Sequence, residues 1–458
     1  MRSLLNRMTS REVRPAKSER AFERTAETRS GLWLILANLG HLLGGKAAAG
    51  VMSLVYLVLV THRLGAAEYG VLVLVNAYAV LIGSVLAFSG FHGVVRYGGI
   101  ALEAGDRAGF ARIVRFLAVI ELGCGAVAVI VAALLVPLIG PRLGWSPDTI
   151  RIAIPYSLAV IATVRATPQG LLQIANRFDL IGIHQAVSPL IRLVGALGVW
   201  VAGGGLIGFI AVWLIAAVAE GLAMWGFGWV AWRKLAAGEP LRGPWRHAAR
   251  DTDGLGRFIL ITNFDITVRE LAPNLAPLTV GWLLGPAAAG LLALTQRATS
   301  LLAQPTVLLS QASYAVLAAQ VARNDLAALR HTVWRSAGLA LAIAAPIVAI
   351  LAFAGDRLLV TLGGASFGGG TVLLILIAGA RAAGLASAPL ASGLTALGLP
   401  GRSMTVGVVT SLALYPLLPA MLWAFGTDGA GWHALLQNGA AIVALALMFR
   451  SDAKGRPA

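Results

Sequence analysis

The stretch LGAAEYGVLVLVNA (64–77) recurs in the second half of the chain as LGPAAAGLLALTQR (284–297). Gly65 then aligns with Gly285, and Gly70 aligns with Gly290. A second pair keeps nearly the same separation, since PQGLLQIANRFD (168–179) matches PLASGLTALGLP (389–400). Self-similarity at a fixed separation is the mark of a repeated structural unit, so we expect two halves of like structure.

Apolar runs long enough to cross a bilayer surround these matches. The chain has 458 residues, of which 58% are hydrophobic and only 12% charged, and its mean hydropathy is +0.80. These values exclude an ordinary soluble enzyme and predict an all-α polytopic membrane protein. Twelve spans can be drawn, at 32–61, 69–97, 110–139, 150–175, 180–202, 206–232, 258–284, 287–318, 329–353, 370–397, 403–425 and 431–448. Because six is an even number, the halves are predicted to be parallel repeats, two six-helix lobes around a central cavity.

The positions of Lys and Arg predict the orientation. With a cytoplasmic N-terminus, 24 Lys and Arg fall on the inner side, whereas only Arg63, Arg142 and Arg357 fall on the outer side. Both termini are therefore predicted to be cytoplasmic. The net charge of +16 is then a topology signal, and no nucleic-acid partner is expected. The predicted segments are a tail (1–30), an N-lobe (31–232), a cytoplasmic linker (233–257), a C-lobe (258–449) and a second tail (450–458).

Several ionisable residues lie inside the predicted spans. A cation at mid-bilayer costs roughly 2.5–3.5 kcal/mol on insertion scales, so each needs water, a partner or a ligand. Lys46 lies roughly 22 Å into its span, and Arg269, Arg297 and Arg381 lie roughly 17 Å into theirs. The predicted path for an anionic group consists of Lys46, Arg96, Arg165, Arg269, Arg297 and Arg381.

Two acids accompany this path. Asp265 and Arg269 are spaced i to i+4 and can pair on one face of a helix, and Glu270 adds a second carboxylate. Asp265 could instead bind a coupling proton or Na⁺. No spacing of His, Cys or acids predicts a metal site, the single cysteine is Cys124, and no cofactor is expected.

The stretch LGAAEYGVLVLVNAYAVL (64–81) resembles the Wzx-type polysaccharide flippases of the multidrug/oligosaccharidyl-lipid/polysaccharide exporter superfamily. FSGFHGVVRYGG (88–99), LLQIANRFDL (171–180) and LLGPAAAGLLAL (283–294) extend the likeness over almost all spans. This sequence departs from the family at Ala66, where the family commonly has proline. The aligned position in the second half is Pro286, which agrees with the family.

The resemblance implies a flippase, not an enzyme, in the bacterial cytoplasmic (inner) membrane. Its cargo would be a polyprenyl-pyrophosphate-linked oligosaccharide, moved from the inner to the outer leaflet by alternating access. Polysaccharide polymerase and assembly proteins would be its partners. In that fold, spans one, two, four, seven, eight and ten line the cavity, and these spans carry the six cations named above.

Three alternatives compete with this interpretation. A drug/cation antiporter of the same superfamily would favour a more acidic or aromatic cavity. A major-facilitator transporter is suggested by GDRAGFAR (105–112), but Leu102, Phe110 and Ala111 depart from its loop signature. A membrane glycosyltransferase or polymerase would need a sizeable outer loop with a catalytic acid or base, and the outer loops offer only scattered single acids.

Overall fold

The computed structural model describes the backbone of residues 17–300 and 316–454, and the side chains of residues 48–300, 316–399 and 401–451. All the regular secondary structure in the described residues is helical. Its first half contains α1 (Lys17–Leu86), α2 (Phe91–Gly93), η2 (Val94–Gly98), α3 (Gly99–Glu103), α4 (Arg107–Ile139), η3 (Pro141–Leu143), α5 (Pro147–Tyr156), η4 (Ser157–Thr163), α6 (Ala166–Ile174), α7 (Phe178–Val201) and α8 (Leu206–Leu235). After these come α9 (Ala248–Asp251), α10 (Leu255–Leu284), α11 (Pro286–Ala298), α13 (Leu326–Gly363), η6 (Ala365–Phe367), α14 (Thr371–Ala396), α15 (Pro400–Leu414), α16 (Leu417–Phe425) and α17 (Asp428–Lys454).

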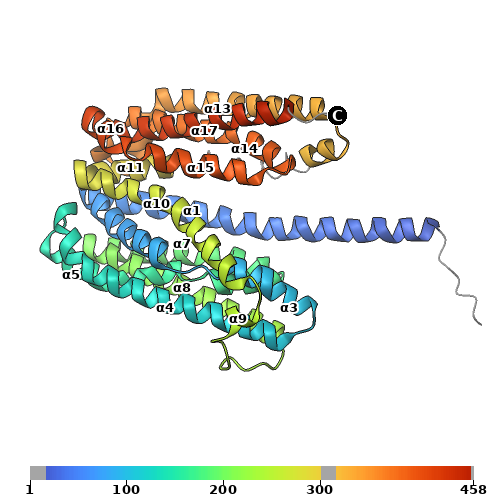
Figure 1. Cartoon of the computed structure of the whole chain (residues 1–458). Helices are drawn as coiled ribbons and strands as arrows, with labels where there is room; N and C mark the ends of the chain where they lie inside the picture. The colour runs from blue at the N-terminus through green and yellow to red at the C-terminus, as the bar shows by residue number, and fades with distance from the viewer. Residues whose placement is uncertain (1–16, 301–315, 455–458) are drawn as a thin grey trace, which may run out of the picture.

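The helices form two bundles that follow the order of the chain (Figure 1). The N-terminal bundle contains α1 to α8, and the C-terminal bundle contains α11 to α17; α10 runs between them. Within the described residues, eight helices are long and apolar enough to cross a membrane, or nine if the bent pair α15–α16 is one span. All twelve predicted spans overlap helical segments, although α1 carries two of them and α5, η4 and α6 share one.

The first helix begins earlier than the sequence analysis places it. Residues 1–30 are predicted as a solvated tail, yet α1 starts at Lys17. The segment 17–30 is rich in Ala, Glu and Arg, which are strong helix formers. A polar segment with this composition can continue a membrane helix beyond the surface of the bilayer.

A single glycine divides α1 into two arms. Gly65 has φ 69° and ψ −179°, a conformation outside the helical region, and the chain turns back there (Figure 1). Its repeat partner Gly285 joins α10 to α11 with φ 87° and ψ 173°. These dihedral angles are accessible only to glycine at little cost, so the aligned glycines make the same turn in both halves. We call the end of the molecule that contains Gly65 the Gly65 end, and the opposite end the linker end.

The repeat continues into the next long helices. Asp106 begins α4 by accepting a hydrogen bond from the amide of Gly109, at 2.8 Å. Asp325 begins α13 in the same way, with the amide of Ala328 at 2.9 Å. The residue before each aspartate is left-handed, Gly105 with φ 74° and Asn324 with φ 57°. The segment that suggested a major-facilitator loop is therefore a helix N-cap that both halves share.

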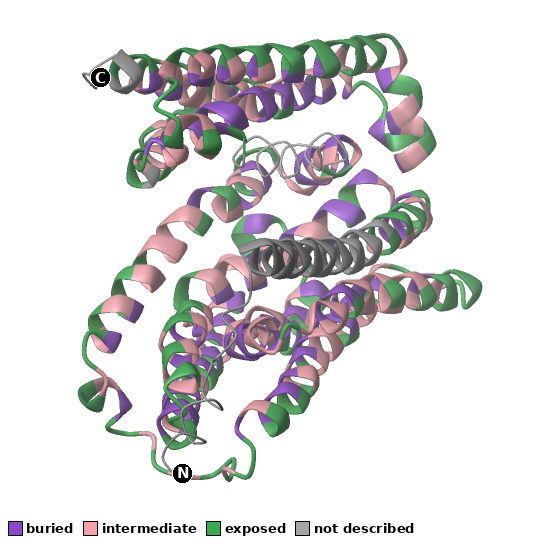
Figure 2. Ribbon diagram, turned by 90° about the vertical axis from the view of Figure 1, so that its right-hand side faces the viewer, coloured by how far each residue is buried: buried purple, intermediate pink, exposed green. Residues whose placement is uncertain are grey.

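The buried core changes along the molecule. At the Gly65 end one cluster joins both bundles, with Leu57 and Tyr69 of α1 packed together with Leu359 and Phe367 from the second half. At the linker end there are two clusters, one around Phe110 and Leu172 in the N-terminal bundle and α10, the other in the C-terminal bundle alone. Figure 2 shows exposed residues along the outer sides of both bundles. The bundles thus share a core at one end and have separate cores at the other.

Candidate functional site

The helix α10 holds an acid and a base one turn apart. Arg269 Nε lies 2.9 Å from Asp265 Oδ2, and both side chains are more than a third exposed. Glu270 is exposed and accepts a long hydrogen bond, 3.4 Å, from Asn274 Nδ2. That amide also donates to Ser84 Oγ of α1, at 3.2 Å. The structure therefore places Asp265 against Arg269 and ties α10 to the second arm of α1.

Arg297 occupies the last turn of α11, close to where the two bundles meet. Its side chain is exposed, and it lies within electrostatic reach of the buried hydroxyl of Tyr69 on α1. No acid in the part of the chain that the structure describes forms an ion pair with it. Its positive charge thus lies near the contact region of the bundles, close to Tyr69.

Arg381 projects from the central helix of the C-terminal bundle. More than half of the apolar stretch of α14 is buried, and the neighbouring Ala380 and Ala382 are buried, but the Arg381 side chain is exposed. It has no ion-pair partner among the described residues. Since an arginine facing lipid at this depth would be costly, the side chain is best placed toward a water-filled space.

Arg96 lies at the linker end, in the π-helical turn η2. Its guanidinium carbon is 4.8 Å from the ring centre of Phe258 and 5.4 Å from that of Tyr97. Phe258 belongs to the first turn of α10, so the cation bridges the two helices through their aromatic faces. Within the described ranges no acid pairs with Arg96.

Arg165 differs from these residues because an acid holds it. Its Nη1 forms a very short ion pair with Oε1 of Glu220 on α8. Sequence reasoning left Glu220 out, because no basic residue lies near it along the chain. An unpaired acid in an apolar helix is itself a signal that a partner exists elsewhere in the fold.

Glu121 is a second acid that sequence reasoning left unassigned. It is fully buried on α4 and accepts hydrogen bonds from the amides of Ala166 and Thr167, at 2.6 and 2.7 Å. These amides are the first two of α6, which have no partner within their own helix. Glu121 on α4 therefore caps the N-terminus of α6. It thereby positions the backbone of Arg165, the residue that precedes this helix.

Arg192 is a cation that the predicted path omits. It lies on α7, with its guanidinium carbon 4.2 Å from the ring centre of Trp213. It interacts with the hydroxyls of Tyr56 and Tyr156, and Nε is buried without a hydrogen-bond partner among the described residues. Its position in the middle of an apolar span is the same signal that identified the other arginines.

The predicted cations thus fall into two groups. Arg165 and Arg269 are paired with acids, whereas Arg96, Arg297 and Arg381 are not paired within the described part of the chain. Lys46 lies in α1, but its side chain falls outside the described residues. No group of three His, Cys, Asp or Glu side chains is arranged to hold a metal ion in the ranges that the structure describes.

Comparison with solved structures identifies the fold. An inward-facing MATE family transporter of the MOP superfamily matches with a TM-score of 0.68 and 14% identity, covering 89% of this chain and 96% of that one. The lipid II flippase MurJ in an inward closed conformation matches with a TM-score of 0.65 and 13% identity, covering 90% and 88%. An outward-facing MATE transporter matches at 0.52 with 15% identity, covering 92% and 95%. The chain is a multi-pass membrane protein with the fold of the MOP superfamily.

Sequence comparison then gives the family. Residues 114–368, more than half of the chain, match the family described as polysaccharide biosynthesis protein, and the chain belongs to this family. The inner membrane protein YghQ of Escherichia coli (strain K12) is 28% identical over 280 residues, which are 61% of this chain and 79% of that protein. The resemblance drawn from the sequence to polysaccharide flippases of this superfamily is confirmed.

Proposed function

We propose that this protein is a flippase of the bacterial inner membrane that moves a polyprenyl-pyrophosphate-linked oligosaccharide from the inner to the outer leaflet. The family is one of polysaccharide biosynthesis, and the fold is shared by MATE transporters and by the lipid II flippase MurJ. The observation that carries the proposal is a set of arginines in apolar helices that have no acidic partner among the described residues, Arg96, Arg297 and Arg381. A pyrophosphate supplies the negative charge that these residues lack.

The proposed orientation has the linker end in the cytoplasm and the Gly65 end outside. The shared core at the Gly65 end and the separate cores at the linker end then correspond to a cavity that opens to the cytoplasm. The higher TM-score against the inward-facing transporter than against the outward-facing one supports this assignment.

The substrate enters with its pyrophosphate toward the arginines, while the sugar occupies the wet space between the bundles and the lipid tail stays in the bilayer. Arg297 and Arg381 bind the phosphates, because guanidinium groups make strong bidentate contacts with phosphate oxygens. Arg96 meets the headgroup first, near the cytoplasmic surface. Arg165 and Arg269, already held by acids, maintain the walls, and Lys46 belongs to the same path by its depth in α1. The bundles then separate at the Gly65 end and close at the linker end.

The rival function is a drug/cation antiporter. Such a transporter would need a carboxylate free to bind a cation. Asp265 is engaged by Arg269, so it is not a free carboxylate, whereas Glu270 is exposed and accepts only a long hydrogen bond from Asn274. Asp265 as a site for a coupling ion therefore requires that Arg269 move away during the cycle.

The test compares surface polysaccharide output at equal protein level for Arg297→Ala, Arg381→Ala and the control Arg335→Ala. Arg335 is an exposed arginine of α13 that lies near the expected membrane surface. Loss of one charge-assisted contact of about 1.5–3 kcal/mol predicts roughly 10- to 100-fold weaker export for the first two variants. Mass spectrometry of co-purified lipids should find a polyprenyl-pyrophosphate glycan on wild type and not on the double variant. Unchanged output in both single variants would refute the arginine site.

A further inference from the structure

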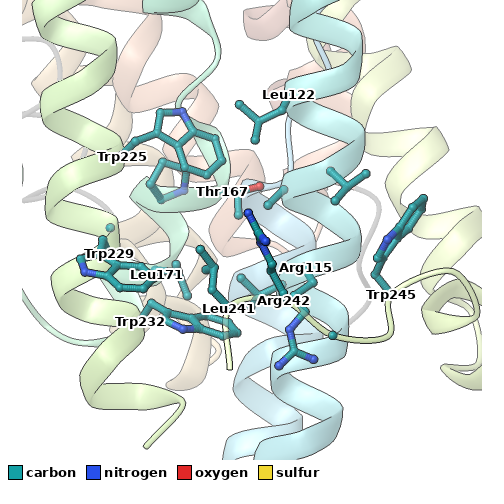
Figure 3. Close-up of a pocket in the computed structure, with 16 residues that line it drawn as sticks. Arg115, Leu122, Thr167, Leu171, Trp225, Trp229, Trp232, Leu241, Arg242 and Trp245 are labelled. Carbon is teal, nitrogen blue, oxygen red and sulfur yellow. The ribbon is translucent and has the colours of Figure 1, made fainter. Parts of the chain in front are cut away.

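A pocket of about 470 Å³ lies in the N-terminal bundle, and none of the arginines of the proposed transport path lines it. Its walls come from α4, α6 and α8, and the linker between α8 and α10 closes its lower side (Figure 3). This volume is in the usual range of sites for one small molecule.

One side of the pocket is aromatic and apolar. Trp225, Trp229 and Trp232 project from α8, facing Leu122 on α4, and Trp245 closes the side formed by the linker (Figure 3). Trp229 and Leu122 are nearly half exposed, whereas Trp232 is buried. This wall is therefore open to the membrane, and tryptophan is the residue that favours the level of lipid headgroups.

Two arginines also line the pocket, and the guanidinium carbon of one of them, Arg115, lies 5.7 Å from the ring centre of Trp232. Arg115 is buried; its Nε and Nη2 donate to the carbonyl oxygen of Pro240, and Nη2 lies 3.5 Å from Glu239 Oε2. Nη1 makes none of these bonds and lies beside Gly243, where a Cβ would come within 2.7 Å of it. Arg242 lines the same pocket, its side chain is exposed, and no acid in the described part of the chain pairs with it.

The charge of the pocket selects the ligand. Glu239 balances one of the two arginines, which leaves one unmatched positive charge, and none of the residues that line the pocket is acidic. A phosphodiester carries one negative charge, whereas a terminal phosphate carries close to two at neutral pH. A zwitterionic headgroup would bring an ammonium group that finds no carboxylate in the pocket wall.

We propose that this pocket binds an anionic diacyl phospholipid of the phosphatidylglycerol type. The phosphodiester contacts Arg242 and Nη1 of Arg115, and an acyl chain lies along Trp229, Leu122 and Trp225. Basic pockets at the cytoplasmic surface of membrane proteins are suited to anionic headgroups. Because Arg115 also holds Pro240, the bound lipid fastens the linker between the two halves to the N-terminal bundle.

The experiment uses the purified full-length protein, titrated in native mass spectrometry with phosphatidylglycerol, phosphatidylethanolamine and undecaprenyl phosphate. Arg242→Gln is compared with Arg250→Gln, an exposed arginine of the same linker that does not line the pocket. Trp229→Ala is compared with Trp423→Ala, an exposed tryptophan in the other bundle. All four side chains are at least partly exposed, so the variants are expected to fold. Hydrogen exchange of residues 236–254 locates the effect.

Wild type should bind phosphatidylglycerol at least about tenfold more tightly than phosphatidylethanolamine, and Arg242→Gln should remove most of that preference. Trp229→Ala should weaken the binding of all three lipids severalfold, while both control variants should bind lipids as wild type does. Phosphatidylglycerol should slow exchange in the linker of wild type and not of Arg242→Gln. Equal affinity of Arg242→Gln and Arg250→Gln, unchanged linker exchange, or tighter binding of undecaprenyl phosphate than of phosphatidylglycerol would each overturn the proposal. These measurements need no transport, so they stand or fall apart from the proposed function.

Discussion

Gly70 of α1 and Gly290 of α11 meet backbone to backbone where the two halves of the chain come together. A Cβ built on Gly70 would lie 1.7 Å from the carbonyl oxygen of Pro286, and one built on Gly290 would lie 2.4 Å from that of Ala66. The contact is reciprocal, because Ala66 and Pro286 occupy equivalent places in the repeat. The two glycines therefore contact each other from equivalent positions of the sequence repeat.

The close approach of these helices predicts a large effect from one methyl group. Gly70→Ala forces the backbones apart, and overpacking of this kind costs about 1–3 kcal/mol. The free energy of unfolding, measured on the purified protein in detergent, should fall by this amount. Gly123→Ala is the matched control, because Gly123 lies in α4 with open space around its Cα; this variant should be as stable as wild type or slightly more so. Equal stability of both variants would contradict the contact.

Much of the architecture could be predicted from the sequence because membrane insertion leaves a strong signal. The apolar spans predicted helices and left breaks at 62–68 and 285–286, where the structure turns at Gly65 and Gly285. The bend between α15 and α16 and the helical start at Lys17 were not predicted, since neither leaves a mark in average hydropathy. The i to i+4 spacing also predicted the ion pair of Asp265 with Arg269, because residues four apart share one face of a helix.

The rest of the candidate site depends on contacts between distant helices. Glu220 lies 55 residues from Arg165, and Glu121 lies 45 residues from Ala166, so no local pattern could pair them. The path predicted from the sequence includes Arg165 as a cation for an anionic group, and the structure pairs it with Glu220. Arg192 was left out although its position in the span was as informative as that of Arg297.

Removal of the carboxylate that caps α6 should destabilise the N-terminal bundle. Glu121→Gln keeps one oxygen acceptor for the amides of Ala166 and Thr167 and replaces the other acceptor with an NH₂ donor. A buried amide left without its acceptor costs about 1–3 kcal/mol, so we expect a loss in that range for Gln and a larger one for Leu. Thermal unfolding measures this loss of stability. The control is Glu103→Gln, because Glu103 is an exposed acid of α3. A Glu121→Leu variant as stable as wild type would show that the cap has no role.

The pair of Arg165 with Glu220 predicts a non-additive result. Arg165→Gln and Glu220→Gln each leave one charge without its partner inside the bundle. The double variant removes both charges, so its loss of stability should be smaller than the sum of the single losses. Because the Arg165 side chain is 38% exposed, we expect a coupling energy of only about 1 kcal/mol.

The same variants separate a structural from a substrate-binding role of Arg165. If the ion pair only maintains the bundle, export should recover in the double variant together with the protein level. If Arg165 contacts the substrate, export should stay low in every variant that lacks it, including the double one. Surface polysaccharide output divided by protein level distinguishes these results.

The contacts at the Gly65 end predict where a cross-link would arrest the cycle. The amide of Ala66 donates to Ser366 Oγ at 3.1 Å, and Thr61 Oγ1 donates to the carbonyl oxygen of Leu362 at 2.7 Å. Both contacts join α1 to the second half of the chain. Alternating access requires these segments to separate, so a disulfide between Ala66→Cys and Ser366→Cys in a Cys124→Ser background should stop export.

Reduction of this disulfide should restore export, which shows that the block is mechanical and not a folding defect. Each single cysteine variant serves as a control and should export normally under oxidising and reducing conditions. The extent of cross-linking is read from gel mobility after proteolysis, and export from surface polysaccharide. Full export by a completely cross-linked protein would mean that the Gly65 end stays closed throughout the cycle. The substrate would then have to leave by another route than the space between the bundles.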